Sequence, residues 1–271
     1  MDFVAPFVWM LRADNPGPMT LDGTRSYVLR APGSSSCVVV DPGPALEPHL
    51  AALAGAGPVE LALVTHRHPD HTGGLARFRE LTGAPSRGGL PEFSVSGGGG
   101  GRVDPLADGE VLDVAGLRIE VLATPGHTAD SVCFVVSDGS SSVVLTGDTV
   151  LGHGTTVLAE PDGSLRDYLR SLDGLSALDL PGPVLGLPGH GPVIQDLGSA
   201  VQAYRAHRLE RLEQVRSALT GLGAELPGAG SPLPDTLLDA VTGAVYSDVD
   251  PSVLIAARSS VRAQLEYLRG R

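Results

Sequence analysis

The chain has 271 residues, which is enough for one large domain and a smaller one. Its net charge is −12, its 19 basic residues are all Arg, and 23 of its 31 acidic residues precede residue 199. An acidic body repels polyanions, so this balance weighs against a general nucleic-acid binder, and an aromatic content of 4% leaves little for base stacking.

The sequence has no signals of a membrane or secreted protein. It contains no apolar run of about 18 residues or more, and its first residues show neither a basic region nor a small-residue cleavage site. The two cysteines, Cys37 and Cys133, lie inside apolar runs, which favours buried thiols over a disulfide framework. We therefore expect a cytoplasmic protein with no membrane partner.

Short apolar runs rich in β-branched residues predict strands in the first two thirds of the chain. These runs are 26–29, 37–40, 61–64, 117–122, 131–136, 143–145 and 184–187. Between them, leucines at helical spacing predict helices within 45–57, 74–83 and 164–175. The segment 111–122 is typical of a hairpin that turns at Ala115 and Gly116, so we expect mixed sheets.

From about Gln195 onward the pattern becomes helical, and we place a domain boundary between residues 198 and 199. Asp250 is the expected N-cap of the last helix, with Pro251 at its first position. Six arginines of this part fall at helical spacing, and we interpret them as a solvated face paired with glutamates. They are Arg205, Arg208, Arg211, Arg258, Arg262 and Arg269.

One polar stretch stands out directly after the apolar run 61–64. His66, His68, Asp70 and His71 form the pattern H-x-H-x-D-H, followed by two glycines. At a strand end, His66 and His68 point the same way, whereas Asp70 and His71 follow Pro69 and reach from another angle. Such a stretch can line two sides of a cavity and hold two cations, an interpretation we prefer to that of a solvated turn.

Three further polar side chains follow apolar runs and lie beside glycine: His127, Asp148 and His190. Glycine lets the backbone turn sharply at a sheet edge and expose the neighbouring side chain. Taken singly, each is as consistent with an ordinary loop residue as with a ligand. Together with the first stretch they provide seven nitrogen and oxygen ligands without a thiolate, which suits two divalent ions, with Zn preferred and Mn or Fe as alternatives.

These blocks, in their order and spacing, resemble the metallo-β-lactamase superfamily over positions 24–192. The resemblance implies an α/β fold, a four-layer αββα sandwich with the metal site at one edge of its two sheets. It also implies that His66, His68 and His127 hold the first ion, that Asp70, His71 and His190 hold the second, and that Asp148 bridges both.

The stretches "ADNPGPMTLDGTRSYVL", "GDTVLGHGTTV" and "LPGHGPVI" and the helical tail are similar to a subgroup with a winged-helix-like C-terminal domain. This resemblance implies a catalytic domain over 1–198 and a small helical, winged-helix-like domain over 199–271. The subgroup includes a single-strand ribonuclease, thioesterases and actinobacterial hydrolases. It usually reads G-T-N-T-Y where this chain has Gly23-Thr24-Arg25-Ser26-Tyr27, which leaves a substrate contact by the missing Asn in doubt.

Two cations that share a water lower its pKa from 15.7 to about 7, which generates hydroxide at neutral pH. Asp70 is the expected catalytic residue, orienting this hydroxide toward the substrate. Asp41 is expected either to hold the ring N–H of a ligand histidine or simply to open a turn. His153 either reaches the substrate, where it could protonate a leaving group, or is a solvated loop residue. We assign no role to His49.

We therefore expect a dinuclear metal-dependent hydrolase, with hydrolysis of single-stranded RNA as the leading prediction. Thioester hydrolysis, of acyl-CoA, acyl-carrier or glyoxalase-II type, is the first alternative. Redox chemistry is disfavoured because a di-iron flavoprotein would have Glu at the position of His68, and a non-catalytic metal-binding scaffold is disfavoured because no ligand is missing. The partner is then a small-molecule or single-stranded RNA substrate, and a homodimer is one of the arrangements we consider.

Overall fold

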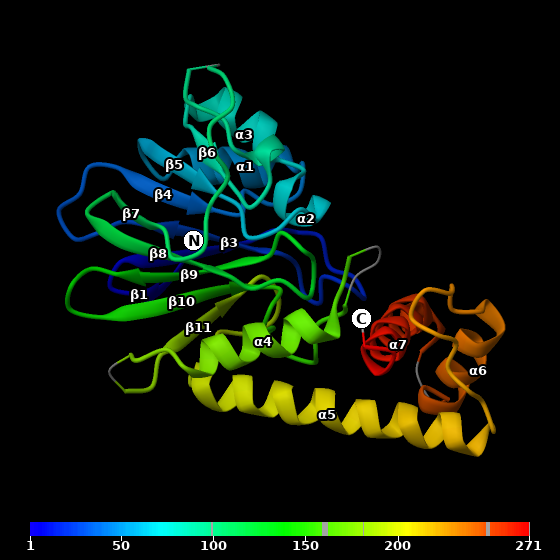
Figure 1. Cartoon of the computed structure of the whole chain (residues 1–271). Helices are drawn as coiled ribbons and strands as arrows, with labels where there is room; N and C mark the ends of the chain where they lie inside the picture. The colour runs from blue at the N-terminus through cyan, green and yellow to red at the C-terminus, as the bar shows by residue number, and fades with distance from the viewer. Residues whose placement is uncertain (99, 159–161, 181, 248–249, 271) are drawn as a thin grey trace. The chain divides into compact units, whose positions relative to one another are not determined.

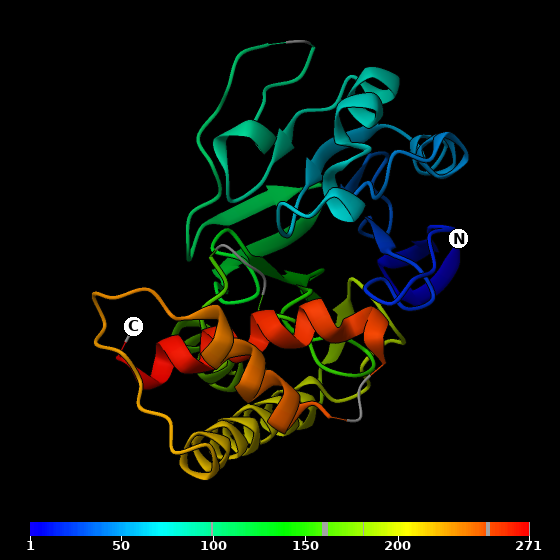
Figure 2. The same ribbon diagram turned by 90° about the vertical axis from the view of Figure 1, so that its right-hand side faces the viewer.

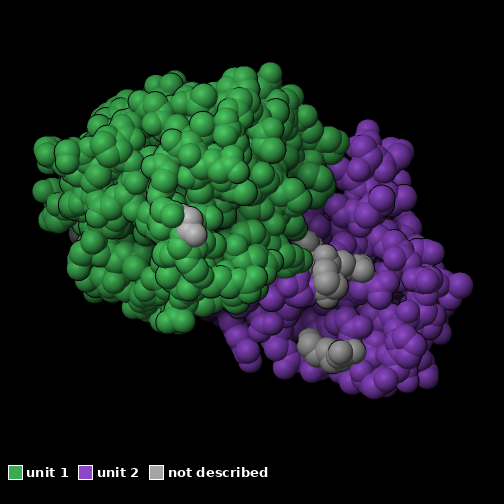
Figure 3. Space-filling model, turned by 90° about the horizontal axis from the view of Figure 1, so that it is seen from above, with its two compact units in different colours: residues 1–123, 130–154, 179–197 green, residues 124–129, 155–178, 198–271 purple. Residues whose placement is uncertain are grey.

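The computed structural model describes residues 1–98, 100–158, 162–180, 182–247 and 250–270. Contacts between Cα atoms divide the chain into two compact units (Figure 3). The first comprises 1–123, 130–154 and 179–197, and the second comprises 124–129, 155–178 and 198–271. The second unit thus begins its long final segment near the expected boundary but also takes two earlier segments, so the division at residue 198 stays a prediction.

The first unit contains a six-stranded sheet in the order β1-β2-β3-β4-β5-β6 (Figure 1). The central strands β3 and β4 are buried along their whole length. This is expected for β4, a continuous apolar and β-branched run, whereas β3 begins with the buried polar residues Arg25 and Ser26. β4 runs parallel to β5, with Val40 opposite Leu63, so both strands end at the same edge. The six strands are β1 (Asp2–Ala5), β2 (Val8–Arg12), β3 (Arg25–Leu29), β4 (Cys37–Val40), β5 (Val59–Leu63) and β6 (Ser86–Arg87).

The second sheet of this unit has the order β11-β10-β9-β8-β7. β7 and β8 form the predicted hairpin, whose turn residues Ala115 and Gly116 have φ of 51° and 74°. β10 pairs in parallel with β11, so these two strands also end at one edge. The bounds are β7 (Val111–Val114), β8 (Leu117–Ala123), β9 (Val132–Ser137), β10 (Ser142–Gly147) and β11 (Leu185–Pro188).

The main core of the first unit lies between the two sheets. Tyr27 and Leu63 of the first sheet pack in one buried cluster with Ile119, Phe134 and Leu145 of the second. The opposite face of the first sheet packs against α1 (Glu47–Ala54) and α3 (Leu75–Thr82) in a separate cluster. This α/β arrangement of helices and two facing sheets is consistent with the predicted four-layer sandwich.

The sequence patterns missed β1 and β2 as well as three short elements. The first two strands pair with each other, and β2 also pairs with β3. Both strands are thus stabilised by pairing with other strands, which a local sequence pattern does not show. The short elements are α2 (Pro69–Thr72), β6 and the 3-10 turn η1 (Pro91–Phe93).

The described part of the second unit is helical. Its long segment carries α5, α6 and α7, which share a core that includes Val215, Leu238 and Val261 (Figures 1 and 2). Asp250 caps the 3-10 turn that leads into α7, accepting a hydrogen bond of 2.8 Å from Ser252 N, whereas the N-cap of α7 itself is Val253. The elements are α4 (Leu165–Ser176), α5 (Leu197–Gly221), α6 (Asp235–Val245), η2 (Pro251–Val253) and α7 (Leu254–Leu268).

The described residues that follow β11 form helices and turns. They include no strand that could form the wing of a winged helix. Across the described part of the whole chain, no helix combines the length and the apolar character needed to cross a bilayer.

Candidate metal centre

Most of the predicted ligands of the first unit come from the ends of parallel strands. β5 ends at Leu63 and is followed by His66 and His68, and the short helix α2 carries Asp70 and His71. β10 and β11, which end at the same edge of the other sheet, are followed by Asp148 and His190. The parallel pairing explains why side chains distant in sequence meet at one place.

One group of ligand atoms is formed by Asp70, His71 and His190, whose atoms all lie within 4.8 Å of one another. Nε2 of His71 lies 3.3 Å from Nε2 of His190 and 3.3 Å from Asp70 Oδ2. Asp148 closes this group, with Oδ1 3.5 Å from His71 Nε2 and Oδ2 3.4 Å from His190 Nε2. Two imidazole nitrogens and two carboxylates therefore converge on one point.

A second group within the first unit is formed by His66, His68 and Asp148. His66 Nε2 lies 2.9 Å from His68 Nδ1 and 3.9 Å from Asp148 Oδ2. His66 is fully buried, whereas His68 is half-buried. Asp148 is thus close to both groups, which is the position that the sequence resemblance implies for a bridging ligand.

Asp41 and Thr65 orient two of these histidines. Thr65 Oγ1 donates to Asp41 Oδ2 over 2.7 Å, so the same hydroxyl oxygen can accept from Nδ1 of His66, 3.1 Å away. Asp41 Oδ2 also lies 2.8 Å from Nδ1 of His71, which donates to it. Because Nδ1 donates in both rings, Nε2 of His66 and of His71 is the ring nitrogen that would bind a metal ion.

Asp70 is held by a second hydrogen-bonded chain. Thr24 Oγ1 donates to Asp70 Oδ2 over 2.9 Å, and Asn15 Nδ2 donates to Thr24 Oγ1 over 3.0 Å. The Asn15 side chain also accepts from Thr24 N, so both ends of its amide are used. Asn15, Thr65 and the hydroxyl of Thr24 were not singled out from the sequence, although Thr24 lies in the G-T-R-S-Y block and Thr65 adjoins the histidine motif.

The charges of the site are strongly coupled. Burial opposes ionisation of Asp70 and Asp148, but the neighbouring His71 and His190 overcome this effect and hold the pKa of both carboxyls well below the usual range. Burial likewise opposes protonation of His190, yet Asp148 and Asp70 raise its pKa to about 9. The carboxylates therefore stay ionised and their negative charge attracts a cation of any kind, protons included.

His127 and His153, the other two predicted histidines, lie in loops. His127 follows β8 by four residues in the segment 124–129 of the second unit, where it is buried, with Nδ1 2.5 Å from Val157 O and 3.1 Å from Thr156 Oγ1. His153 belongs to the first unit, and its side chain is exposed. Neither of the two metal-ligand groups includes His153.

Two residues behave differently from the sequence interpretation. His49, to which we assigned no role, is buried and lies 2.8 Å from Ser26 Oγ. Arg208, expected on a solvated face, is only 2% exposed, so that prediction was wrong for this residue. Arg205 does lie on the surface and pairs with Asp173. Arg269 pairs with Glu266, but its side chain is only 1% exposed, so the prediction of a solvated face was wrong for this residue too.

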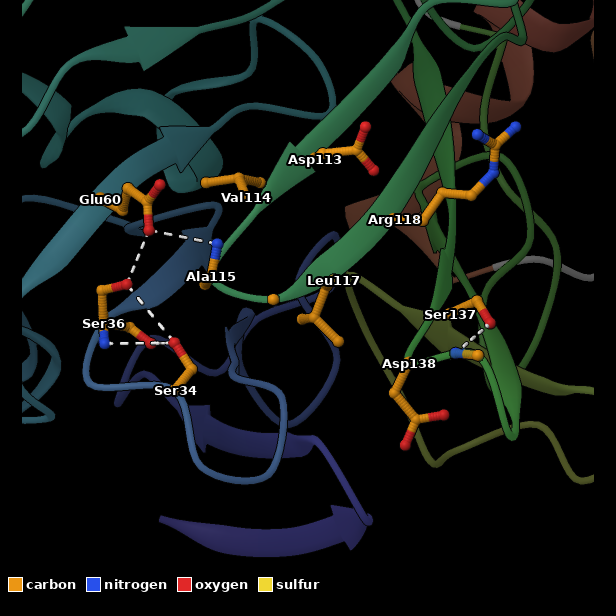
Figure 4. A pocket seen from close by; sticks show the side chains of 12 residues that line it. Ser34, Ser36, Glu60, Asp113, Val114, Ala115, Leu117, Arg118, Ser137 and Asp138 are labelled. Atoms are coloured by element: carbon orange, nitrogen blue, oxygen red, sulfur yellow. Dashed lines mark hydrogen bonds between the residues drawn. The ribbon is translucent and has the colours of Figure 1, made fainter.

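A separate cavity of about 510 Å³ lies at the opposite ends of the strands (Figure 4). Glu60 accepts hydrogen bonds from Ser36 Oγ and Ala115 N at its wall, and Asp113 and Asp138 also line it. Glu60 lies near the start of β5, Ala115 in the β7–β8 turn and Asp138 in the β9–β10 turn, whereas the metal-ligand groups follow the ends of β5, β10 and β11. The cavity therefore lacks the histidines that define the candidate metal centre.

The donor set suits divalent metal ions. Each group combines imidazole nitrogens with carboxylate oxygens and has no thiolate, which is the chemistry that Zn, Mn and Fe accept. Asp41 fixes the tautomer of His71, and Gly23 O lies 3.4 Å from Nδ1 of His190, so the Nε2 atoms of both rings face the other ligands. The residues present thus fit the ions that the fold implies.

The fold and the ligand pattern define the class of protein. Residues 19–192 match the profile of the metallo-beta-lactamase superfamily. The chain therefore belongs to this superfamily and is a hydrolase, as predicted from the sequence.

Comparison with individual proteins narrows the class. The chain is 33% identical, over 265 residues, to an atrochrysone carboxyl ACP thioesterase of Aspergillus chevalieri, covering 93% of this chain and 78% of that protein. It is 32% identical to the protein of the same name from Aspergillus fumigatus, covering 92% and 78%. The crystal structure of a metallo-beta-lactamase family protein from Thermus thermophilus is similar with a TM-score of 0.74 and 25% identity, covering 98% of this chain and 94% of that one.

Proposed function

We propose that this hydrolase cleaves acyl thioesters and uses two divalent metal ions to do so. The observation that carries the proposal is the similarity, over nine tenths of the chain, to proteins named as thioesterases. It reverses the order of the two predictions from sequence, since the thioester alternative now stands ahead of single-stranded RNA. The acidic charge and the few aromatic residues also fit a thioester better than a polyanion.

The proposed ligands are the seven predicted residues. His66, His68 and His127 would hold the first ion, Asp70, His71 and His190 the second, and Asp148 would bridge them. Nδ1 of His127 is engaged by the carbonyl oxygen of Val157, so Nε2 is the ring nitrogen that would bind a metal ion. Zn remains the preferred ion, with Mn and Fe as alternatives, because sites of His and Asp accept all three.

When bound, the ions would lower the pKa of a coordinated water and stabilise negative charge on the substrate carbonyl oxygen. The protein's own contribution centres on Asp70. Its Oδ2 is engaged by Thr24, His71 and His190, so Oδ1 is the atom that can accept a proton from the attacking water. The Asp70 side chain is 24% exposed, whereas His71 is fully buried, so Asp70 is the member of its group that solvent reaches.

A thioester makes modest demands on such a site. Water attacks the carbonyl carbon, the carbon–sulfur bond breaks, and the products are a carboxylic acid and a thiol. A thiol with a pKa of about 8.5 leaves readily as a thiolate, so the reaction does not require a strong general acid. This is consistent with an exposed His153 that belongs to neither ligand group, and a role for His153 in protonating a leaving group stays a prediction.

The proposal is tested by supplying the purified protein, with Zn or with Mn, with an acyl-CoA, a short acyl thioester, a single-stranded RNA and bis(p-nitrophenyl) phosphate. We expect thiol release from the thioesters, loss of turnover after chelation, and recovery when metal is returned. Both cysteines are buried, so a thiol-reactive dye reports the product with little background from the protein. Turnover of RNA without turnover of any thioester would overturn the proposal.

Variants of the site provide the control. Asp70→Ala and His71→Ala are expected to abolish turnover while the protein stays folded, since each removes a ligand without emptying the sheet core. His153→Ala should retain most activity because its side chain is exposed. The winged-helix-like character of the C-terminal domain and the actinobacterial subgroup remain predictions, as does the homodimeric state.

A further inference from the structure

The ring orientation of His127 depends on two residues of an irregular segment. Its Nδ1 lies 2.5 Å from Val157 O and 3.1 Å from Thr156 Oγ1. A carbonyl oxygen can only accept a hydrogen bond, so Nδ1 must carry the proton and, in the neutral ring, Nε2 is the acceptor nitrogen. Residues 155–158 have no regular secondary structure, so their position depends on contacts from elsewhere.

Those contacts come from two helices of the same unit. Arg208 Nη2 on α5 donates a hydrogen bond to Thr156 O, and Ser259 Oγ on α7 donates one of 2.7 Å to Leu158 O. The Arg208 guanidinium also lies over the Tyr168 ring, 5.1 Å from its centroid. The carbonyl next to the one that fixes His127 is therefore held by a buried cation.

Arg208 is an unusual residue in its helix. It is 2% exposed, and in the part of the chain that the structure describes no carboxylate forms an ion pair with it. Its neighbours one turn away are less buried: Arg205 is exposed and pairs with Asp173, and Arg211 is half-buried over the Tyr246 ring. Burying a guanidinium without a carboxylate is unfavourable, so a local reason for its presence is needed.

The turn that carries His127 is held from the other side by α4. Ser164 N donates to Gly126 O over 3.0 Å, and Ser171 Oγ donates to Pro125 O over 2.7 Å. A Cβ atom on Gly126 would lie 2.4 Å from Tyr168 Cα, so only glycine permits this approach. Tyr168 thus touches the turn with its backbone and carries Arg208 on its ring.

We propose that Arg208 is a positioning residue for His127: by holding Thr156 O it fixes the adjacent carbonyl of Val157 and, through it, the ring of His127. The inference rests on the proposed function, in which His127 is a metal ligand. A single arginine on α5 would then set the orientation of one proposed ligand of the same unit. Arg208 itself acts only through His127 and is not a catalytic residue.

The test compares Arg208→Met with Arg205→Met. Met preserves most of the apolar volume but removes the donor, and Arg205→Met makes the same change one turn earlier on the surface. We expect both proteins to fold, and we expect Arg208→Met alone to weaken one of two Zn-binding steps by about 10- to 100-fold in a chelator competition titration. ¹⁵N NMR of the metal-free proteins provides the second measurement. In Arg208→Met, the ring Nδ1–H signal of His127 should be lost or should exchange with water faster than in Arg205→Met.

The outcomes separate the two proposals. If His127→Ala loses one Zn and Arg208→Met binds Zn with unchanged affinity, the inference fails while the proposed ligand set stands. If His127→Ala retains both ions, the ligand assignment fails and the inference fails with it. Arg208→Lys keeps a donor and a positive charge, so its Zn affinity should fall less than that of Arg208→Met. If Arg208→Met does not fold, Arg208→Lys is compared with the unmodified protein instead.

Discussion

Thr24 Oγ1 donates a hydrogen bond of 2.9 Å to Asp70 Oδ2, although the two residues lie 46 positions apart in the chain. Thr24 follows the loop that ends at Gly23 and precedes β3, and it forms an isolated antiparallel bridge with His190. Its hydroxyl accepts from Asn15 and donates to Asp70, so its direction is fixed. The proposed nucleophile-orienting carboxylate is thus held by the N-terminal loop as well as by its histidine neighbours.

Removal of this hydroxyl should loosen Asp70. We expect Thr24→Val to lower the affinity for the second ion and the turnover number by about 10- to 100-fold, the range typical of residues that orient a metal ligand. Thr24→Ser keeps the donor and should stay within a few-fold of the unmodified protein. Zn titration together with kcat and KM checks the prediction, and equal metal affinity in the Val and Ser variants would contradict it.

Asp41 offers a test of tautomer control. Its backbone has φ of 50°, a region that Asn also tolerates, so Asp41→Asn changes the charge with little backbone strain. The amide is a weaker acceptor for His71 Nδ1–H and Thr65 Oγ1–H, so both rings lose part of their orientation. We expect Zn affinity to fall by about 10- to 100-fold, measured by competition titration of the folded variant. Unchanged affinity would contradict this prediction and would show that Thr65 and the backbone are sufficient to orient the two histidine rings.

The sequence pointed to the residues of the first unit that could hold a metal ion because strand ends, glycines and histidines are local features. His66 and His71 are found from a short motif, and Asp148 and His190 follow apolar runs. The strands themselves were also predictable, since β4 is a short run of buried apolar residues and β8 alternates buried apolar residues with more exposed ones. What could not be predicted was which strands pair, and so β1 and β2 were missed.

The residues that orient the ligands were largely hidden from the sequence. Asp41 was suspected because it ends a strand, whereas Thr24 and Thr65 are common residues whose roles depend on one hydroxyl direction. The burial of Arg208 was not predicted, because its spacing along the helix matches that of the less buried Arg205 and Arg211. Only the packing of α5 shows that Arg208 is buried. Substrate choice was likewise not decided by the metal motif, which is common to hydrolases of several kinds.

His49 predicts a pH dependence of stability that is independent of the metal ligands. Burial lowers its pKa from 6.5 to about 4, so between these values the unfolded chain binds a proton that the folded protein does not. The free energy of unfolding should therefore fall as pH decreases from 6.5 to 4, by up to about 3 kcal/mol at 1.36 kcal/mol per pKa unit. The His49→Gln variant should show a shallower fall in urea unfolding of the metal-free protein, whereas the exposed His153→Gln should match the unmodified chain.

Gly189 tests how tightly the metal centre is packed. A Cβ atom at this position would lie 2.4 Å from Asp148 Oδ1 and 2.6 Å from His71 Cε1, and neither side chain can move freely because His71 is fixed by Asp41. Gly189→Ala should therefore displace two proposed ligands without removing any, lowering Zn affinity at least 10-fold and the free energy of unfolding by about 1–3 kcal/mol. The matched control is Gly174→Ala in α4, where the added methyl meets nothing within 4 Å. Gly174→Ala should leave Zn binding unchanged. If Gly189→Ala binds Zn as tightly as this control, the two proposed ligands can shift at little cost and the prediction is wrong.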